Sequence, residues 1–274
     1  MGVYICINLC NLSLVFGWLK EVDMGKVALI TGGSQRIGKG ISNALAQNGY
    51  DIVVHYNSDK RGAIDVVKNA RSHGVQAYEI KANLLNDKET LALISKSRDL
   101  VGKPLTLLIN NASIFEFDTI ETASLTSWDR HFGTNLKAPF FLSQAFLEQA
   151  PDPIEDEKNE LVAQAQIINM IDQRVVNISP YFSTYTIAKM ALWAFTRTAA
   201  QEMAPRVRVN AIGPGPTLQA HNQTVESFNK QRKNTVLRRG SNIEDITDCL
   251  LFFLNSNSVT GQLVCVDGGQ SLEW

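Results

Sequence analysis

The chain has 274 residues, a formal net charge of −1 at pH 7 and 45 % hydrophobic residues, the composition of an ordinary globular protein. A charge so close to zero argues against nucleic acid as a partner, because it provides no basic field. The four cysteines lack the paired spacing of a metal site, so no metal is expected, and they are typical of reduced thiols in a cytoplasmic protein: Cys6, Cys10, Cys249 and Cys265.

The first 23 residues differ from the rest of the chain. Residues 3–19 are largely apolar, but three polar residues interrupt them and no Lys or Arg precedes them. A secretory signal needs a basic start, and a membrane-spanning helix needs about 20 apolar residues. We therefore expect residues 1–23 to be an extension or a wrongly assigned start, with a membrane anchor as the alternative. Residues 24–274 are expected to form one domain that does not enter a membrane.

From Lys26 onwards, short apolar runs alternate with helical patterns. The runs read as near-continuous apolar segments, which is typical of strands that are buried on both faces of a parallel sheet. The sequence predicts the α/β class, as a doubly wound parallel sheet of about seven strands with helices on both faces. The expected strands are 27–31, 52–55, 77–82, 105–109, 167–171, 207–211 and 262–266. The first expected helices are 39–48, 61–73 and 88–100.

Two segments depart from this alternation. Residues 151–160 are acidic and rich in proline, and we expect a solvated surface insertion there. Residues 213–240 carry two prolines and then a basic stretch that includes Lys230 and Arg239. A long excursion at this point is often a lid over a substrate, although a merely solvated helix would explain its charges equally well.

A glycine-rich turn, from Gly32 to Gly38, directly follows the first expected strand and opens a helix. In sheets of this kind, such a turn binds a dinucleotide, because its backbone N–H groups and the helix N-terminus meet the pyrophosphate.

A phenol and an ammonium lie four residues apart, at Tyr185 and Lys189, and therefore share one face of an expected helix. The strand over 167–171 ends beside Asp172, which adds a carboxyl group. A nearby cation favours phenolate, so we expect a lowered pKa for Tyr185 and a role for it in proton transfer.

Five motifs appear in a familiar order: Thr31-Gly32…Gly38, Asn110-Asn111-Ala112-Ser113, Asn135, Tyr185-x-x-x-Lys189 and Asn210-Ala211-Ile212-Gly213-Pro214-Gly215. From Lys26 to the C-terminus the chain thereby resembles the short-chain dehydrogenase/reductase family. The resemblance implies a Rossmann-type fold, with Tyr185 as general acid, Lys189 as the group that lowers its pKa and binds the nicotinamide ribose, and Asn135 as the holder of a relay water. It also implies cofactor contacts at Gly32, Ile37, Gly38, Asn83, Asn111, Ala112, Ser113, Lys189, Pro214 and Gly215.

Two departures from the family pattern concern the cofactor. Arg36 replaces the middle glycine of the turn and places a cation near the cofactor phosphates. The second strand ends in His55-Tyr56-Asn57-Ser58 rather than in a carboxylate. Because a 2′-phosphate is repelled by a carboxylate and welcomed by polar donors, NADPH is the expected cofactor, with Asp59 as the feature that speaks against it.

A third departure concerns the substrate, since Asp172 stands where the family has a catalytic serine. An ionised carboxylate repels a developing alkoxide but tolerates a substrate nitrogen. The chain thus resembles the pteridine and dihydromonapterin reductases, a branch with Arg in the glycine turn and an Asp–Tyr–Lys group. There the Phe of Asn-Ala-Ser-x-Phe, here Phe115, lies flat on the pterin. The resemblance implies substrate contacts at Arg36, Phe115, Asp172 and Tyr185, although Asp172 as a simple loop cap is the plainer alternative.

The sequence therefore predicts an NADPH-dependent reductase that reduces a dihydropterin-like C=N bond. A carbonyl reductase, such as one for 3-oxoacyl thioesters, and a non-catalytic cofactor-binding scaffold are the alternatives. Family members form homodimers or homotetramers, here through helices around Trp128–Phe146 and Ser183–Ala200, and a cytoplasmic location is expected.

Overall fold

The computed structural model describes residues 25–220 and 223–272, so the predictions for residues 1–23 lie outside the described residues. A parallel sheet in the order β3-β2-β1-β4-β7-β8-β9 forms the centre of the molecule and confirms the expected fold class. Each of the seven expected strands is present, with ends that differ by up to three residues: β1 Val27–Ile30, β2 Asp51–Tyr56, β3 Ala77–Lys81, β4 Leu107–Asn110, β7 Ala165–Met170, β8 Val207–Pro214 and β9 Leu263–Val266.

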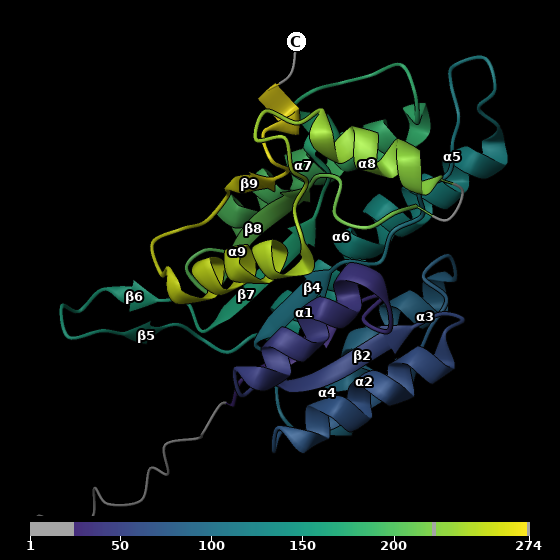
Figure 1. Ribbon diagram of the computed structural model, residues 1–274. Helices are drawn as coiled ribbons and strands as arrows, with labels where there is room; N and C mark the ends of the chain where they lie inside the picture. Colours follow the sequence, from purple (N-terminus) through teal and green to yellow (C-terminus); the bar gives the residue numbers. More distant parts are fainter. Residues whose placement is uncertain (1–24, 221–222, 273–274) are drawn as a thin grey trace, which may run out of the picture.

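Helices cover both faces of this sheet (Figure 1). One face packs against α1 (Arg36–Gln47), α2 (Lys60–Ser72) and α9 (Ile243–Asn255), with Phe253 fully buried in the layer between them. The other face packs against three helices, with Phe146 at its centre: α4 (Leu93–Val101), α6 (Ala138–Gln149) and α7 (Ser183–Glu202). Because apolar layers lie on both sides, the strands carry almost unbroken apolar runs.

The sheet reverses its direction of winding at β1, which pairs with β2 on one side and with β4 on the other. In open α/β sheets, a crevice forms at the carboxyl ends of the strands where the order reverses. The glycine turn, which follows β1, and the segment 111–124, which follows β4, therefore meet at this edge.

Three local features differ from the expected elements. The helix expected over 88–100 is two helices, α3 (Asp87–Leu91) and α4, which meet at Ala92. The acidic insertion is solvated as expected, and its strand β5 (Ile154–Glu155) forms an antiparallel hairpin with β6 (Leu161–Val162), which directly follows the insertion. A π-helical turn, Gly133–Lys137, joins α5 (Leu125–Phe132) to α6.

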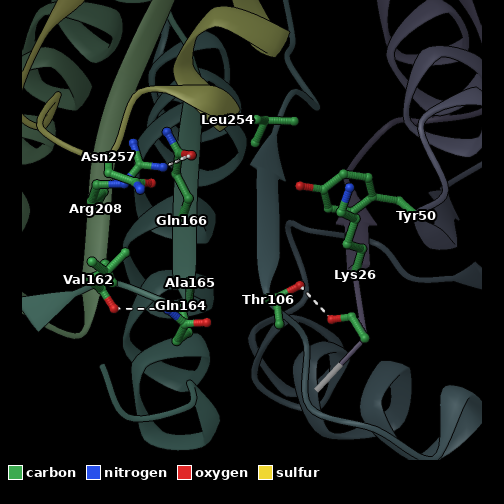
Figure 2. A pocket seen from close by; sticks show the side chains of 12 residues that line it. Lys26, Tyr50, Thr106, Val162, Gln164, Ala165, Gln166, Arg208, Leu254 and Asn257 are labelled. Atoms are coloured by element: carbon green, nitrogen blue, oxygen red, sulfur yellow. Dashed lines mark hydrogen bonds between the residues drawn. The ribbon is translucent and has the colours of Figure 1, made fainter. Parts of the chain in front are cut away.

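A cavity of about 450 Å³ lies at the amino ends of the strands, opposite the crevice (Figure 2). Lys26 and Tyr50 line one side of it, and Gln166 and Arg208 line the other. The Arg208 guanidinium donates to the carbonyls of Phe253, Ser256 and Val259. This cation therefore connects β8 to the end of α9 and to the loop that follows α9.

Within the part of the chain that the structure describes, no helix is both long enough and apolar enough to cross a membrane. Cys249 and Cys265 are free and half-buried, and burial raises the pKa of Cys249 to about 11, so its thiol is protonated at neutral pH. Cys6 and Cys10 lie outside the described residues.

Candidate active site

Tyr185, Lys189 and Asp172 meet at the carboxyl end of β7, as the sequence predicts. The Tyr185 hydroxyl donates to Oδ2 of Asp172 over 2.8 Å, and the Lys189 ammonium donates to the carbonyl of Met170 over 2.7 Å. The side chains of Tyr185 and Lys189 are only 5 % and 2 % exposed. Asp172 is also the N-cap of a 3₁₀ turn, Gln173–Val175, because its Oδ1 accepts from the Arg174 N–H. The loop-capping role and the contact with Tyr185 thus belong to different oxygens of one carboxylate.

The electrostatics of this group correct one prediction. Burial and the neighbouring Asp172 carboxylate raise the pKa of Tyr185 well above its ordinary value, whereas the sequence predicts a lowered one. The Lys189 ammonium lies over the Tyr185 ring, 5.8 Å from its centre, and burial lowers the pKa of that amine to about 8. Burial also raises the pKa of Asp172. The prediction was wrong because it considered the cation of Lys189 and left out burial and the anion of Asp172.

The glycine turn is held in place by side chains at the carboxyl ends of three strands, β1, β4 and β2. The Thr31 hydroxyl donates to the Ile109 carbonyl, and the Asn111 amide donates to the carbonyls of Thr31 and Gly32. His55 is buried, with Nδ1 accepting from the Gly32 N–H and Nε2 bonded to the Ala82 carbonyl. Both ring nitrogens of His55 are therefore engaged beneath the turn, and burial lowers the pKa of His55 to about 4.

The N-terminus of α1 is open for an anion at this turn. The N-cap residue of this helix is Gln35, and its side chain makes no capping hydrogen bond to the backbone N–H groups of the first turn. The first turn of α1 also holds no acidic residue. Gly38 is required for the close path of the backbone, since a Cβ there would lie 2.1 Å from the Gly32 carbonyl oxygen. Ile37 is half-buried against the apolar layer around α1. These features fit the pyrophosphate of a dinucleotide.

Arg36 takes the place of a glycine with a left-handed φ of +53° and bridges to the distant excursion. Its guanidinium donates to the carbonyls of Gln219 at 3.0 Å and Leu218 at 3.2 Å. The side chain therefore lies between the glycine turn and residues 213–240, at the edge where a cofactor and a substrate are expected to meet.

The residues at the end of β2 that are predicted to face a 2′-phosphate differ in their exposure to solvent. Tyr56 is buried, whereas Asn57 and Ser58 are exposed next to the turn. The Asp59 carboxylate accepts from the Gly62 N–H and caps α2. Asn83 is exposed after β3, and its Oδ1 accepts from the Leu85 N–H. Asp59 thus has a structural task, which weakens it as an argument against NADPH.

Phe115 offers an aromatic face beside the acid. Its ring is 44 % exposed, meets the Tyr185 ring edge-on at 4.7 Å and stacks on Phe182 with centroids 4.3 Å apart. The Arg174 guanidinium lies over the Phe182 ring at 4.8 Å. Ala112 and Ser113 precede Phe115 in the same segment. A hydrogen bond between the Ser113 side chain and Tyr185 partly opposes the rise in the pKa of Tyr185.

Asn135 lies in the π-helical turn and is fully buried. Its Oδ1 accepts from the Ile114 N–H and its Nδ2 donates to the Ile114 carbonyl, both over 2.9 Å. Single π-helical turns occur frequently at functional sites. The side chain of Asn135 therefore fixes the segment that carries Phe115, while its role with a relay water stays a prediction.

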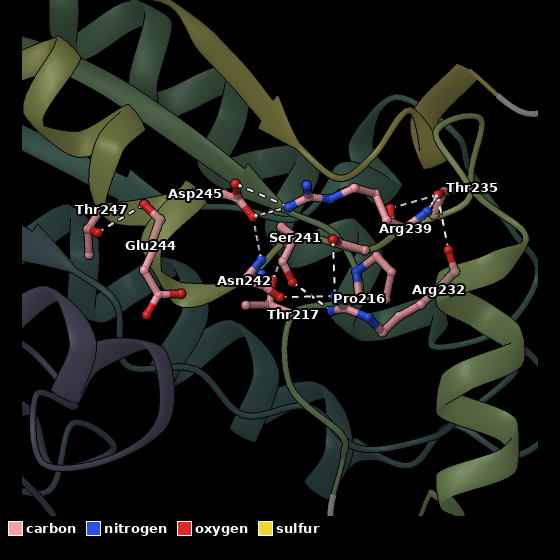
Figure 3. Close-up of polar contacts among 11 residues, drawn as sticks. Pro216, Thr217, Arg232, Thr235, Arg239, Ser241, Asn242, Glu244, Asp245 and Thr247 are labelled. Carbon is pink, nitrogen blue, oxygen red and sulfur yellow. Dashed lines mark hydrogen bonds and ion pairs between the residues drawn. The ribbon is translucent and has the colours of Figure 1, made fainter.

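The excursion after β8 is firmly anchored (Figure 3). Pro214 ends the strand and Gly215 follows it, and α8 (Val225–Lys233) lies further along. The Arg232 guanidinium donates to the carbonyls of Pro216, Ser241 and Gly240, and Arg239 forms an ion pair with Asp245. Two of the five basic residues of this stretch, Arg232 and Arg239, therefore form contacts within the protein, and the other three are Lys230, Lys233 and Arg238.

Sequence reasoning missed three residues beside this site. His131, Thr184 and Asp118 form a buried hydrogen-bonded group next to Tyr185. They come from three separate segments, and no local pattern in the sequence indicates that they meet.

The family is decided by a match to the model of the short chain dehydrogenase family, which covers residues 26–230. The chain belongs to this family. The chain is therefore an oxidoreductase of the short-chain dehydrogenase/reductase type.

Two reductases and a dehydrogenase are among the proteins to which this chain is similar. A 3-oxoacyl-(acyl-carrier-protein) reductase of Staphylococcus aureus is 28 % identical over 253 residues, which is 90 % of this chain and 99 % of that protein. The crystal structure of the FolM alternative dihydrofolate reductase 1 of Brucella suis, in complex with NADP, superposes with a TM-score of 0.84 at 36 % identity and covers 92 % of this chain and 97 % of that one. A short chain dehydrogenase of Burkholderia cenocepacia, also with NADP, superposes with a TM-score of 0.81 at 25 % identity.

Proposed function

We propose that this short-chain reductase uses NADPH to reduce a C=N bond of a dihydropterin-like substrate. The observation that carries the proposal is the Tyr185–Asp172 hydrogen bond, which puts a carboxyl group where an alkoxide would be repelled and a protonated nitrogen is tolerated. The Phe115 ring, which is partly exposed and meets the Tyr185 ring edge-on, would provide a platform for a planar heterocycle.

The chain has groups that fit NADPH. The open N-terminus of α1 suits the pyrophosphate, while Asn57 and Ser58 provide polar donors for a 2′-phosphate. The NADP in the Brucella suis and Burkholderia cenocepacia structures supports the same cofactor. When bound, NADPH supplies the hydride. Lys189, whose ammonium donates to the Met170 carbonyl at the end of β7, would hold the ribose hydroxyls.

The proton comes from the chain's own residues. The Tyr185 phenol carries its proton at neutral pH, and its hydroxyl is the acid that transfers this proton to the substrate nitrogen. Asp172 accepts the hydrogen bond of the same hydroxyl and so orients it, and the proton that Tyr185 gives up is replaced from solvent.

A carbonyl reductase is the second candidate, and the Staphylococcus aureus relative favours it. A 3-oxoacyl substrate on an acidic carrier would need a basic docking surface. Arg232 and Arg239 are occupied within the protein, which leaves Lys230, Lys233 and Arg238 for that purpose. The remaining charges give weaker support to this candidate than Asp172 gives to the pterin.

The test is loss of NADPH absorbance with dihydromonapterin, dihydrobiopterin and dihydrofolate, compared with acetoacetyl thioester, using protein that starts at Met24. Turnover of a pterin that Tyr185→Phe abolishes supports the proposal. Turnover of the thioester alone would overturn it in favour of the carbonyl reductase.

Self-association through α5, α6 and α7 belongs to the same proposal. These helices expose large apolar side chains, such as Trp128, Phe140 and Ile187, which agrees with the expected dimer or tetramer interface. Light scattering of the full chain measures this directly, and a monomer at assay concentration would contradict it.

A further inference from the structure

The catalytic helix α7 begins without a cap of its own. Its N-cap residue, Phe182, has a left-handed φ of +59° and makes no side-chain cap bond. Instead Asp118, from the segment after β4, accepts the Thr184 N–H at Oδ1 over 3.1 Å, and its backbone carbonyl accepts the Phe182 N–H. A carboxylate at this position is favoured by the helix dipole. A distant loop therefore fixes the first turn of the helix that carries Tyr185.

His131 extends this contact to a second helix. Its Nε2 lies 3.1 Å from the Glu116 N–H, which only donates, so Nε2 is the acceptor and Nδ1 carries the proton. Nδ1 therefore donates to the Thr184 hydroxyl over 2.6 Å, and that hydroxyl donates onward to Oδ2 of Asp118. The imidazole is 0 % exposed, and burial lowers its pKa, so the neutral tautomer is the relevant one.

The two ring nitrogens of His131 serve two parts of the site. The Nδ1 side reaches Thr184, the residue directly before Tyr185. The Nε2 side holds Glu116, directly after Phe115, while Asn135 holds Ile114 directly before it. The Phe115 backbone is thus held on both sides, and the His131 ring itself meets the Tyr185 ring edge-on at 5.9 Å.

We propose that His131 and Thr184 are positioning residues that hold the acid, Tyr185, in register with the substrate platform, Phe115. The part that concerns Phe115 rests on the proposed function, whereas the part that concerns Tyr185 holds for any substrate of the enzyme. A displacement of about 1 Å at the reacting groups is worth up to roughly 100-fold in rate, so this link has a measurable consequence.

Thr184 gives the first test, with a matched pair of substitutions. Thr184→Val removes the hydroxyl at nearly constant shape, and Thr184→Ser keeps it. We expect Thr184→Val to lower kcat by about 10- to 100-fold with an unchanged Kd for NADPH, and Thr184→Ser to stay within about threefold of the wild type. A Thr184→Val protein that binds NADPH normally and keeps the wild-type kcat would overturn the proposal.

His131 gives a second test that separates the two functions of its ring and does not depend on Thr184→Val folding. Asn places an amide donor near the position of Nδ1, and Gln places an acceptor near the position of Nε2. We expect His131→Asn to raise KM for the substrate more than it lowers kcat, and His131→Gln to lower kcat more than it raises KM. Equal effects of the two substitutions on both constants, with NADPH binding intact, would contradict the proposal.

The outcome is distinguishable from a failure of the proposed function. All constants are measured with whichever substrate the wild-type enzyme reduces. If that substrate is the thioester and not a pterin, the proposed function fails, while the loss of kcat in Thr184→Val and His131→Gln still tests the link to Tyr185.

Discussion

The Tyr185 hydroxyl and Oδ2 of Asp172 are joined by a hydrogen bond of 2.8 Å, so the acid of the site is paired with a carboxyl group. This pairing affects the protonation of Tyr185. A phenol is protonated at neutral pH, and burial and the Asp172 carboxylate raise the pKa of Tyr185 further, so Tyr185 enters the reaction as the proton donor that a reductase requires. In the family pattern a serine takes this position, and a serine carries no charge that would act on the phenol in this way.

Removal of the phenolic hydroxyl should stop the reaction without affecting cofactor binding. We expect Tyr185→Phe to lower kcat by about 10²–10⁴-fold, the usual contribution of a positioned general acid. Tyr181→Phe is the matched control, because Tyr181 is exposed and lies against Phe117 rather than Asp172. Steady-state kinetics with an NADPH titration measure both variants, and full turnover by Tyr185→Phe would remove Tyr185 from the mechanism.

The rate should depend on the protonation of Lys189. Burial lowers the pKa of this amine to about 8, so the charge that holds the ribose and acts on Tyr185 is present below that pH and lost above it. We expect kcat/KM for NADPH to decrease above about pH 8, while Tyr185, with its raised pKa, stays protonated. A pH–rate profile that is flat well beyond pH 8 is the contrary result.

The same lysine also predicts a change in stability with pH. Between pH 8 and 10.5, the unfolded chain holds a proton on Lys189 that the folded chain has released. The free energy of unfolding should therefore rise over this range, and Lys189→Met should remove that part of the rise. Urea denaturation at several pH values gives the free energy of unfolding of both proteins. The same dependence of this free energy on pH in the two proteins would contradict the lowered pKa.

The glycine turn should not accept a side chain at Gly38. A Cβ there would lie 2.1 Å from the Gly32 carbonyl oxygen, so Gly38→Ala must displace the start of α1. We expect the Kd for NADPH to rise at least about tenfold, a cost of about 1.4 kcal/mol. Gly49→Ala is the control, because a Cβ at Gly49 meets nothing within 4 Å; its φ of +79° costs about 1 kcal/mol of stability and leaves NADPH affinity intact. Equal affinities in a fluorescence titration would refute this account of the turn.

The excursion after β8 should loosen when its anchor is removed. Arg232→Ala deletes the bonds to the Pro216, Gly240 and Ser241 carbonyls, and we expect kcat and KM to change together, as they do for lid mutants. Hydrogen bonds from a charged donor contribute about 1.5–3 kcal/mol each, so the melting temperature should also fall. Lys233→Ala, the exposed neighbour, should change neither, and a similar effect of both variants would show that Arg232 is no anchor.

The sheet was predictable because its strands are local signals. Each is an apolar run long enough to be buried on two faces, and the glycine turn and the Tyr–Lys pair are likewise defined by neighbours in sequence. The helix over 88–100 was harder, since neither Gly nor Pro marks Ala92, where α3 ends and α4 begins.

The parts that sequence did not predict depend on long-range contacts. His131 and Thr184 are 53 positions apart, and Asp118 caps a helix 66 positions away. The pKa of Tyr185 has the same origin, because its sign depends on how deeply the phenol is buried and on which Asp172 oxygen faces it. His55 belongs here too: its place at the end of β2 was predicted, but its two backbone partners lie in the turn after β1 and directly after β3.

The central claim is that the Tyr185–Asp172 pair selects a C=N bond over a carbonyl. The most direct measurement is the ratio of kcat/KM for a dihydropterin to kcat/KM for acetoacetyl thioester, in the wild-type enzyme and in Asp172→Ser. We expect the wild type to favour the pterin and Asp172→Ser to move the ratio towards the thioester by about tenfold or more, because a hydroxyl donor replaces a negative charge beside the developing alkoxide. An unchanged ratio, or a wild-type enzyme that prefers the thioester, would contradict the claim.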